Sequence, residues 1–72
     1  MFSVILHTLD NGAVLSITES KHYRAQDARK HASKCATEYA ARYEGATVEK
    51  RVGDRWTIHK ANGITFAQFD VE

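Results

Sequence analysis

The sequence contains no proline and almost no sulfur, and many of its apolar residues are small. Cys35 is the only cysteine among 72 residues. That excludes an internal disulfide and any zinc site with two or more sulfur ligands from one chain. Hydrophobic residues make up 43% of the chain, which argues against disorder, but ten of them are alanine. We therefore expect one small domain, 1–72, with a thin core.

The start of the chain lacks the marks of a leader or a membrane span. The segment MFSVILHTLDNG has no basic stretch before its apolar residues, and its apolar run is short. A lone cysteine fits a reducing compartment. We expect a cytoplasmic protein with no membrane partner.

Motifs that carry chemistry are also missing from the sequence. It has no HExxH, no CxxC, no glycine-rich phosphate loop and no nucleophile elbow. No two histidines are four residues apart, and His22 and His31 are predicted to lie on opposite faces or outside a shared helix. We therefore expect no enzyme activity, no metal site and no cofactor.

Local patterns predict five strands and one helix. The Asn-Gly pairs at 11–12 and 62–63 are strong hairpin signals, because both residues tolerate positive φ. The predicted elements are strands over Phe2–Leu9 and Ala13–Thr18, a helix over Arg24–Tyr43, and strands over Ala46–Val52, Arg55–Lys60 and Ile64–Val71, with 19–23 as a connection. This β-β-α-β-β-β order predicts an α+β fold, in which one helix covers one face of a single antiparallel sheet.

The predicted helix has a narrow stripe of mostly small side chains. The stripe consists of Ala25, Ala28, Ala32, Cys35, Ala36, Tyr39 and Tyr43. We expect the helix to lie close to the sheet and Cys35 to be buried. On the last strands, Trp56 is predicted to lie in the core. Phe66 and Phe69 have opposite parity, which predicts either a bulge or an exposed aromatic side chain.

Basic and acidic residues are concentrated in different segments of a chain whose net charge is only +1. Residues 21–34 carry five basic residues and one acidic residue, and residues 50–60 carry four basic residues and one acidic residue. One interpretation is a surface that faces phosphates; the other is a solvated helix face and an edge hairpin protected from aggregation by its charge. The low overall charge argues against a strong non-specific nucleic-acid binder.

From Ala25 onward the chain resembles a known class of small protein. It reads AQDARKHASKCA and then GATVEKRVGDRWTIHKANGITFAQF. A basic, alanine-rich helix leads through Gly-x-Thr-Val to a strand that ends in Arg-Val, and then to a tryptophan, a glycine turn and an aromatic strand. This order resembles the anti-CRISPR proteins that phages direct against type I CRISPR systems, in particular a type I-F inhibitor of similar length. The likeness covers about two thirds of the chain.

The resemblance implies function without catalysis in the host bacterial cytoplasm. Such proteins bind the backbone subunits of the RNA-guided surveillance complex and block hybridisation of target DNA. The matching helix positions are Arg29, Lys30, Ser33 and Lys34, whereas His31 stands where the likeness would favour an apolar residue.

The candidate partner-binding residues are therefore Arg24, Arg29, Lys30, His31, Ser33, Lys34, Arg51 and Arg55. Two alternatives remain open at this point. One is a small nucleic-acid-binding module that uses the basic helix and hairpin. The other is a phage structural or assembly protein that forms a weak homodimer through the open sheet face.

Overall fold

The computed structural model describes residues 1–10 and 12–72; Asn11, half of the first predicted turn, lies outside the described residues. The elements are β1 (Phe2–Asp10), β2 (Ala13–His22), α1 (Ala25–Ala41), β3 (Thr47–Arg51), β4 (Arg55–His59) and β5 (Thr65–Val71). The predicted order and the α+β fold are confirmed, and most element boundaries agree with the prediction to within two residues.

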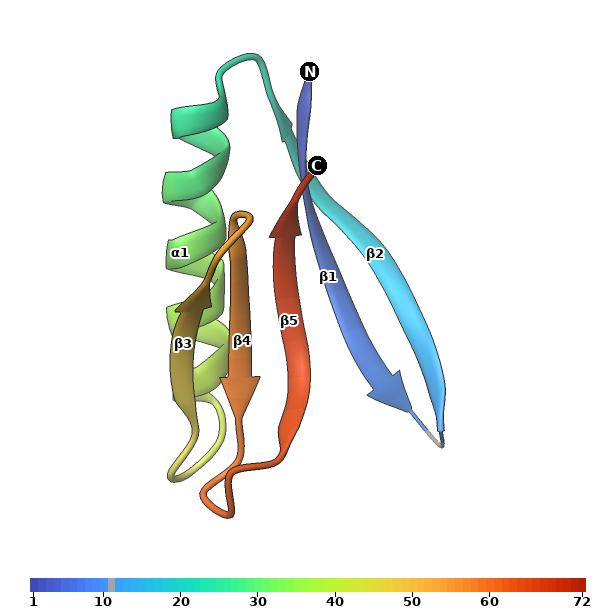
Figure 1. Cartoon of the computed structure of the whole chain (residues 1–72), viewed down its shortest axis with the longest axis vertical. Helices are drawn as coiled ribbons and strands as arrows, with labels where there is room; N and C mark the ends of the chain where they lie inside the picture. The colour runs from blue at the N-terminus through green and yellow to red at the C-terminus, as the bar shows by residue number, and fades with distance from the viewer. Residues whose placement is uncertain (11) are drawn as a thin grey trace.

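One antiparallel sheet holds all five of these strands, in the order β2-β1-β5-β4-β3 (Figure 1). The last strand, β5, lies in the middle and joins the N-terminal hairpin to the C-terminal strands. α1 packs on one face of the sheet, which leaves the other face uncovered. Both ends of the chain meet at the β1–β5 junction, where Ser3 and Glu72 exchange two backbone hydrogen bonds of 2.7 and 2.9 Å.

The strand β2 is longer than the sequence pattern predicted. It continues past Thr18 to His22, and a register shift beside Val4 lets Ser20 and His22 pair with β1. The prediction that 19–23 is a connection is therefore wrong for residues 19–22. Backbone groups there pair with β1 although the side chains are polar, because ladder hydrogen bonds do not depend on side-chain polarity.

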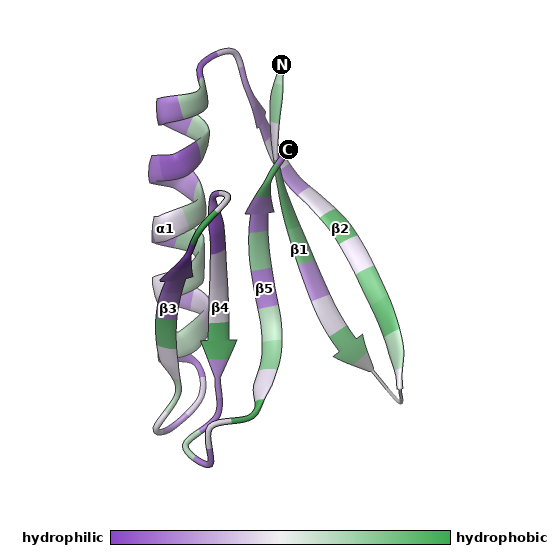
Figure 2. Ribbon diagram, viewed as in Figure 1, coloured by the Kyte–Doolittle hydropathy of each residue, from purple (hydrophilic) through white to green (hydrophobic). Residues whose placement is uncertain are grey.

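The core is thin, as predicted, because α1 contributes only methyl groups to its centre. Every fourth residue of α1 is a buried alanine: Ala28, Ala32, Ala36 and Ala40. They lie with the sheet residues Val4, Leu6, Trp56, Ile58, Ala67 and Phe69 in one cluster. Hydrophobic and hydrophilic residues alternate along the ribbons of α1 and of the strands (Figure 2). Cys35 packs at the margin of this cluster and is half-buried, so the prediction that it is buried holds only in part.

A bulge explains the opposite parity of the two late phenylalanines. The register between β4 and β5 shifts at Ile58/His59, which leaves Phe66 as an extra residue. Phe66 and Phe69 both reach the Tyr39 ring on α1, with centroids 6.1 and 5.9 Å away. The bulge alternative is therefore confirmed. Trp56 is 4% exposed and lies in the core as predicted, where its cross-strand neighbour is Phe69.

Gly45 and Gly53 both have positive φ, and alanine substitutions at these two positions test whether the close contact between Gly45 and Ala61 matters for stability. Gly45 has φ +75°, and a Cβ there would lie 2.9 Å from the Ala61 Cβ; Gly53 has φ +86° with nothing within 4 Å. We expect Gly45→Ala to lower the free energy of unfolding by about 2 kcal/mol, and Gly53→Ala by about 1 kcal/mol from backbone strain alone. Urea denaturation measures both, and equal losses would show that the Ala61 contact contributes nothing.

Candidate functional site

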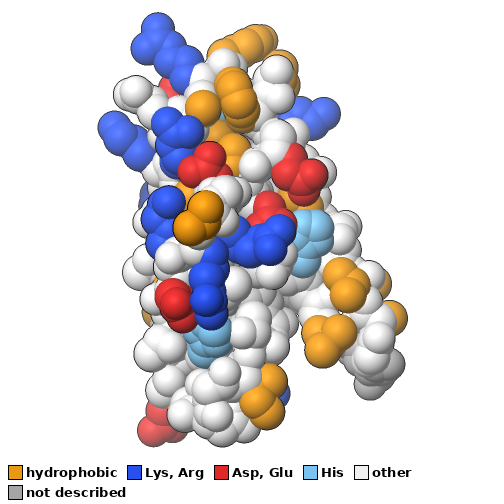
Figure 3. Space-filling view, in the orientation of Figure 1, with side chains coloured by type: hydrophobic (Ala, Val, Ile, Leu, Met, Phe, Trp, Pro, Cys, Tyr) orange, Lys and Arg blue, Asp and Glu red, His pale blue; other side chains and the backbone are white. Residues whose placement is uncertain are grey.

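Polar side chains cover most of the sheet face opposite α1, apart from the apolar Ile5, Leu9 and Val14 of the β1–β2 hairpin. One row crosses all five strands in register: Ser16, His7, Gln68, Thr57 and Glu49. Figure 3 looks onto this face, where basic, acidic and histidine side chains gather. A polar uncovered face is typical of an antiparallel sheet that has only one face packed.

The two hairpin arginines of the predicted binding set have carboxylate partners on this face. Arg55 Nε lies 2.9 Å from Asp70 Oδ1, and Arg51 lies 3.4 Å from Glu49. Asp70 is only 7% exposed, so its pairing with Arg55 neutralises a nearly buried charge. Arg55 therefore pairs with a nearly buried carboxylate, whereas the Arg51–Glu49 pair is solvated and contributes little to stability. Both arginines lie on the sheet face opposite α1.

Arg29 is also held within the molecule. Its guanidinium lies 3.6 Å from the Asp54 carboxylate, which connects α1 to the turn between β3 and β4. The side chain remains 43% exposed, so the pair is solvated and contributes little to stability.

The remaining candidates form one surface on α1. Arg24, Lys30, Ser33 and Lys34 are exposed and His31 is half-exposed; these five residues are the basic helix face. Within the described part of the chain, neither Lys30 nor Lys34 forms an ion pair. Like charges at i and i+4 destabilise a helix by about 0.2–0.5 kcal/mol, so this arrangement does not serve stability.

A hollow beside the basic helix face is lined by His22, Asp27, Lys30, His31 and Lys34 and has a volume of about 280 Å³. His22 belongs to β2 and His31 to α1, so the predicted alternative that they lie outside a shared helix is confirmed. Their rings nevertheless lie 5.1 Å apart, a contact that the spacing in the sequence did not predict. Because β2 extends to His22, its end reaches the side of α1. Two lysines and two imidazoles around this hollow favour a carboxylate or another anion, and the Asp27 carboxylate, which also lines it, offsets part of the positive charge.

Cys35 lies on another side of α1, in a hollow with Glu19, Glu38 and Tyr39. Burial raises the pKa of the Cys35 thiol, and the charges of Glu19 and Glu38 raise it further. The thiol therefore stays protonated near neutral pH, which disfavours a nucleophilic role.

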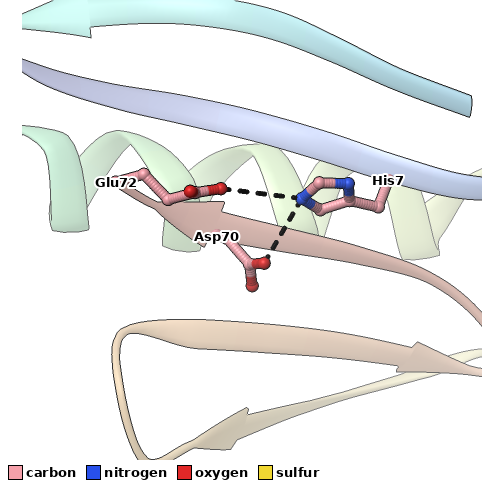
Figure 4. Close-up of side chains that lie close together, drawn as sticks. All are labelled: His7, Asp70 and Glu72. Carbon is pink, nitrogen blue, oxygen red and sulfur yellow. Dashed lines mark ion pairs between the residues drawn. The ribbon is translucent and has the colours of Figure 1, made fainter.

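Sequence reasoning missed the group formed by His7, Asp70 and Glu72 on the uncovered face (Figure 4). These residues come from opposite ends of the chain and meet because β1 pairs with β5. A partial signal was present: a two-residue turn at 11–12 places His7 opposite Ser16. No local pattern in the sequence predicts the pairing of β1 with β5.

Comparison with known proteins identifies no relative. No protein-family model matches the chain, and neither a curated protein nor a solved structure does. Within residues 1–10 and 12–72, no helix has the length and apolar character needed to cross a bilayer.

Proposed function

We propose that this protein inhibits a type I CRISPR surveillance complex without catalysis, by binding its backbone subunits and blocking hybridisation of target DNA. The observation that carries the proposal is the pair Lys30 and Lys34, two exposed ammonium groups one turn apart that lack an ion-pair partner among the described residues. The resemblance carried by the segment ARKHASK supports the choice of partner. The site of action would be the host bacterial cytoplasm.

The chemistry of such an interface is an acidic protein surface placed against the basic helix face. A carboxylate of the partner can enter the hollow between Lys30, Lys34 and the two imidazoles. A protein seated on the backbone subunits occupies the path of the target strand, so inhibition requires no bond to be made or broken. The affinity then depends on how completely the lysine contacts exclude water.

The charge arrangement favours an acidic protein surface over a nucleic-acid backbone. Arg29, Arg51 and Arg55 have intramolecular carboxylate partners. The two hairpin arginines also project from the sheet face opposite α1, whereas Lys30 and Lys34 project from the side of α1 opposite its alanine stripe. The phosphate backbone of a nucleic acid needs several cations along one path.

A second candidate function, assembly through self-association, is favoured by the apolar side chains of the β1–β2 hairpin. Leu9, Val14, Leu15 and Ile17 are 49–67% exposed. β2 is also an edge strand, with a free row of backbone groups. Antiparallel pairing of two β2 strands about Ser16 would place Leu15 of one copy against Ile17 of the other. The edge of β2 is therefore a better surface for a homodimer than the polar face of the sheet.

One experiment separates the three functions. The purified chain is mixed with a guide-loaded type I surveillance complex, and size-exclusion chromatography is run at about 0.1 M and about 0.5 M salt. We expect co-elution at both salt concentrations and loss of target-DNA binding by the complex. Binding to free nucleic acid that falls steeply with salt would support the nucleic-acid module instead. Elution of the chain alone, at twice its mass, would support the assembly protein.

A further inference from the structure

Three potential metal ligands converge on the uncovered face of the sheet. His7 Nε2 lies 3.3 Å from Asp70 Oδ2 and 3.9 Å from Glu72 Oε2. One ligand atom from each residue falls within 4.8 Å of the other two (Figure 4). Tetrahedral zinc with ligands at about 2.0–2.2 Å separates its ligand atoms by about 3.4 Å, so small side-chain adjustments close the site.

The His7 imidazole is held in the orientation that a metal ligand requires. Its Nδ1 lies 2.7 Å from Ser16 Oγ, across the β1–β2 ladder. When Nδ1–H donates to this hydroxyl oxygen, Nε2 carries a lone pair directed at the two carboxylates. Metal-bound histidines in proteins typically donate the other ring N–H to an acceptor in this way. In that tautomer a cation can take the place of the proton between Nε2 and the two carboxylate oxygens.

The two carboxylates are anchored as well. Asp70 Oδ1 accepts a hydrogen bond from Arg55 Nε at 2.9 Å, and Oδ2 accepts one from Gln68 Nε2 at 3.1 Å. Glu72 follows β5, but its backbone N–H and C=O are both bonded to Ser3. All three ligands therefore project from paired backbone, and their mutual positions are set by the β1–β5 register.

We propose that His7, Asp70 and Glu72 bind one divalent transition-metal ion, for which Zn²⁺ is the best match. One imidazole and two carboxylates suit Zn²⁺, whereas Ca²⁺ and Mg²⁺ prefer an all-oxygen shell. The ion would crosslink β1 to β5 and so connect the N-terminal hairpin to the C-terminal strands. A water would complete a tetrahedral shell. This site is independent of the proposed inhibitory function.

A second histidine on the same face provides a matched control. His59 Nε2 lies 3.4 Å from Glu49, but both of its ring nitrogens are 2.9 Å from threonine hydroxyls, those of Thr57 and Thr65. It therefore has one carboxylate instead of two and no free nitrogen. His22 provides a further control, because the hollow beside it is lined by two lysines and by one carboxylate, that of Asp27, instead of the two carboxylates that face His7.

The test is isothermal titration of metal-free protein with Zn²⁺. We expect one ion per chain, affinity reduced at least about tenfold in His7→Gln and in Glu72→Gln, and unchanged affinity in His59→Gln and His22→Gln. Ser16→Ala, which only removes the hydroxyl that orients His7, should weaken binding about tenfold. Zn²⁺ should also raise the melting temperature of the wild type but not that of His7→Gln.

The Glu72 side chain is 62% exposed, so Glu72→Gln keeps the fold even if His7→Gln does not. Circular dichroism of each variant checks this point. Absence of Zn²⁺ binding by the wild type would overturn the proposal. The proposal would also be overturned if the two single variants His7→Gln and Glu72→Gln each bound Zn²⁺ like the wild type, or if His22→Gln lost binding.

Discussion

Replacing Ala32 with leucine is expected to lower the free energy of unfolding by about 3 kcal/mol, which is most of the stability of a domain this small. Ala32 is fully buried at the middle of α1, and Ala28 and Ala36 on either side are also fully buried. A leucine there forces the helix away from the sheet, and overpacking of this kind costs about 1–3 kcal/mol and occasionally more. A domain of this size often has only about 3–5 kcal/mol in total. Guanidinium denaturation followed by circular dichroism measures the loss.

The matched control is Ala41→Leu, at an exposed position near the end of the same helix. Both substitutions make the same chemical change, but the control meets solvent and should alter stability by less than about 0.5 kcal/mol. If Ala32→Leu unfolds at the same denaturant concentration as Ala41→Leu, α1 does not depend on close approach to the sheet.

The fold class could be predicted because each element has a strong local signal. The apolar and branched residues of β1, the alternation at the start of β2, the alanine stripe of α1 and the turn at Asn62-Gly63 each report on a few neighbouring residues. Errors arose where a polar segment joined the sheet. Residues 19–22 look like a connection by composition, but pairing with β1 satisfies their backbone groups.

The arrangement of the sheet could not be predicted from local patterns. The central place of β5 depends on pairing between the two ends of the chain, and no spacing in the sequence reports that pairing. For the same reason, local patterns could not predict the cluster of His7, Asp70 and Glu72. Nor could they predict the His22–His31 contact, because that contact requires β2 to extend farther than its hydrophobic alternation does.

The candidate surface on α1 was more accessible to prediction than the sheet face. A helical period of 3.6 residues places Lys30 and Lys34 opposite the alanine stripe, and both are exposed as expected. The period could not show which cations have partners. Arg29, Arg51 and Arg55 looked equivalent to the two lysines by charge, but they differ in having carboxylates nearby.

Replacing both Lys30 and Lys34 with glutamate is expected to weaken binding to the surveillance complex by about 3 kcal/mol, which is more than a hundredfold in Kd. Both side chains are exposed and neither has an ion-pair partner in the described chain, so the fold should be unchanged. At the interface, each reversal removes an attraction and places two like charges together. A binding titration against the complex measures the loss, and circular dichroism checks the fold.

The control for this prediction is the double variant Lys21→Glu and Lys60→Glu. It makes the same change in net charge at two exposed lysines that lie outside α1. Long-range electrostatic attraction depends on the total charge of the protein. If this attraction alone held the complex together, both double variants would lose the same affinity. Added salt would then remove the difference between each variant and the wild type. If α1 docks on the complex, we expect a large loss of affinity for the α1 variant only, and this loss should persist at high salt. If the α1 variant folds normally and binds like the wild type, the basic helix face is not the interface, and the β2 edge with its exposed Leu15 and Ile17 becomes the leading surface.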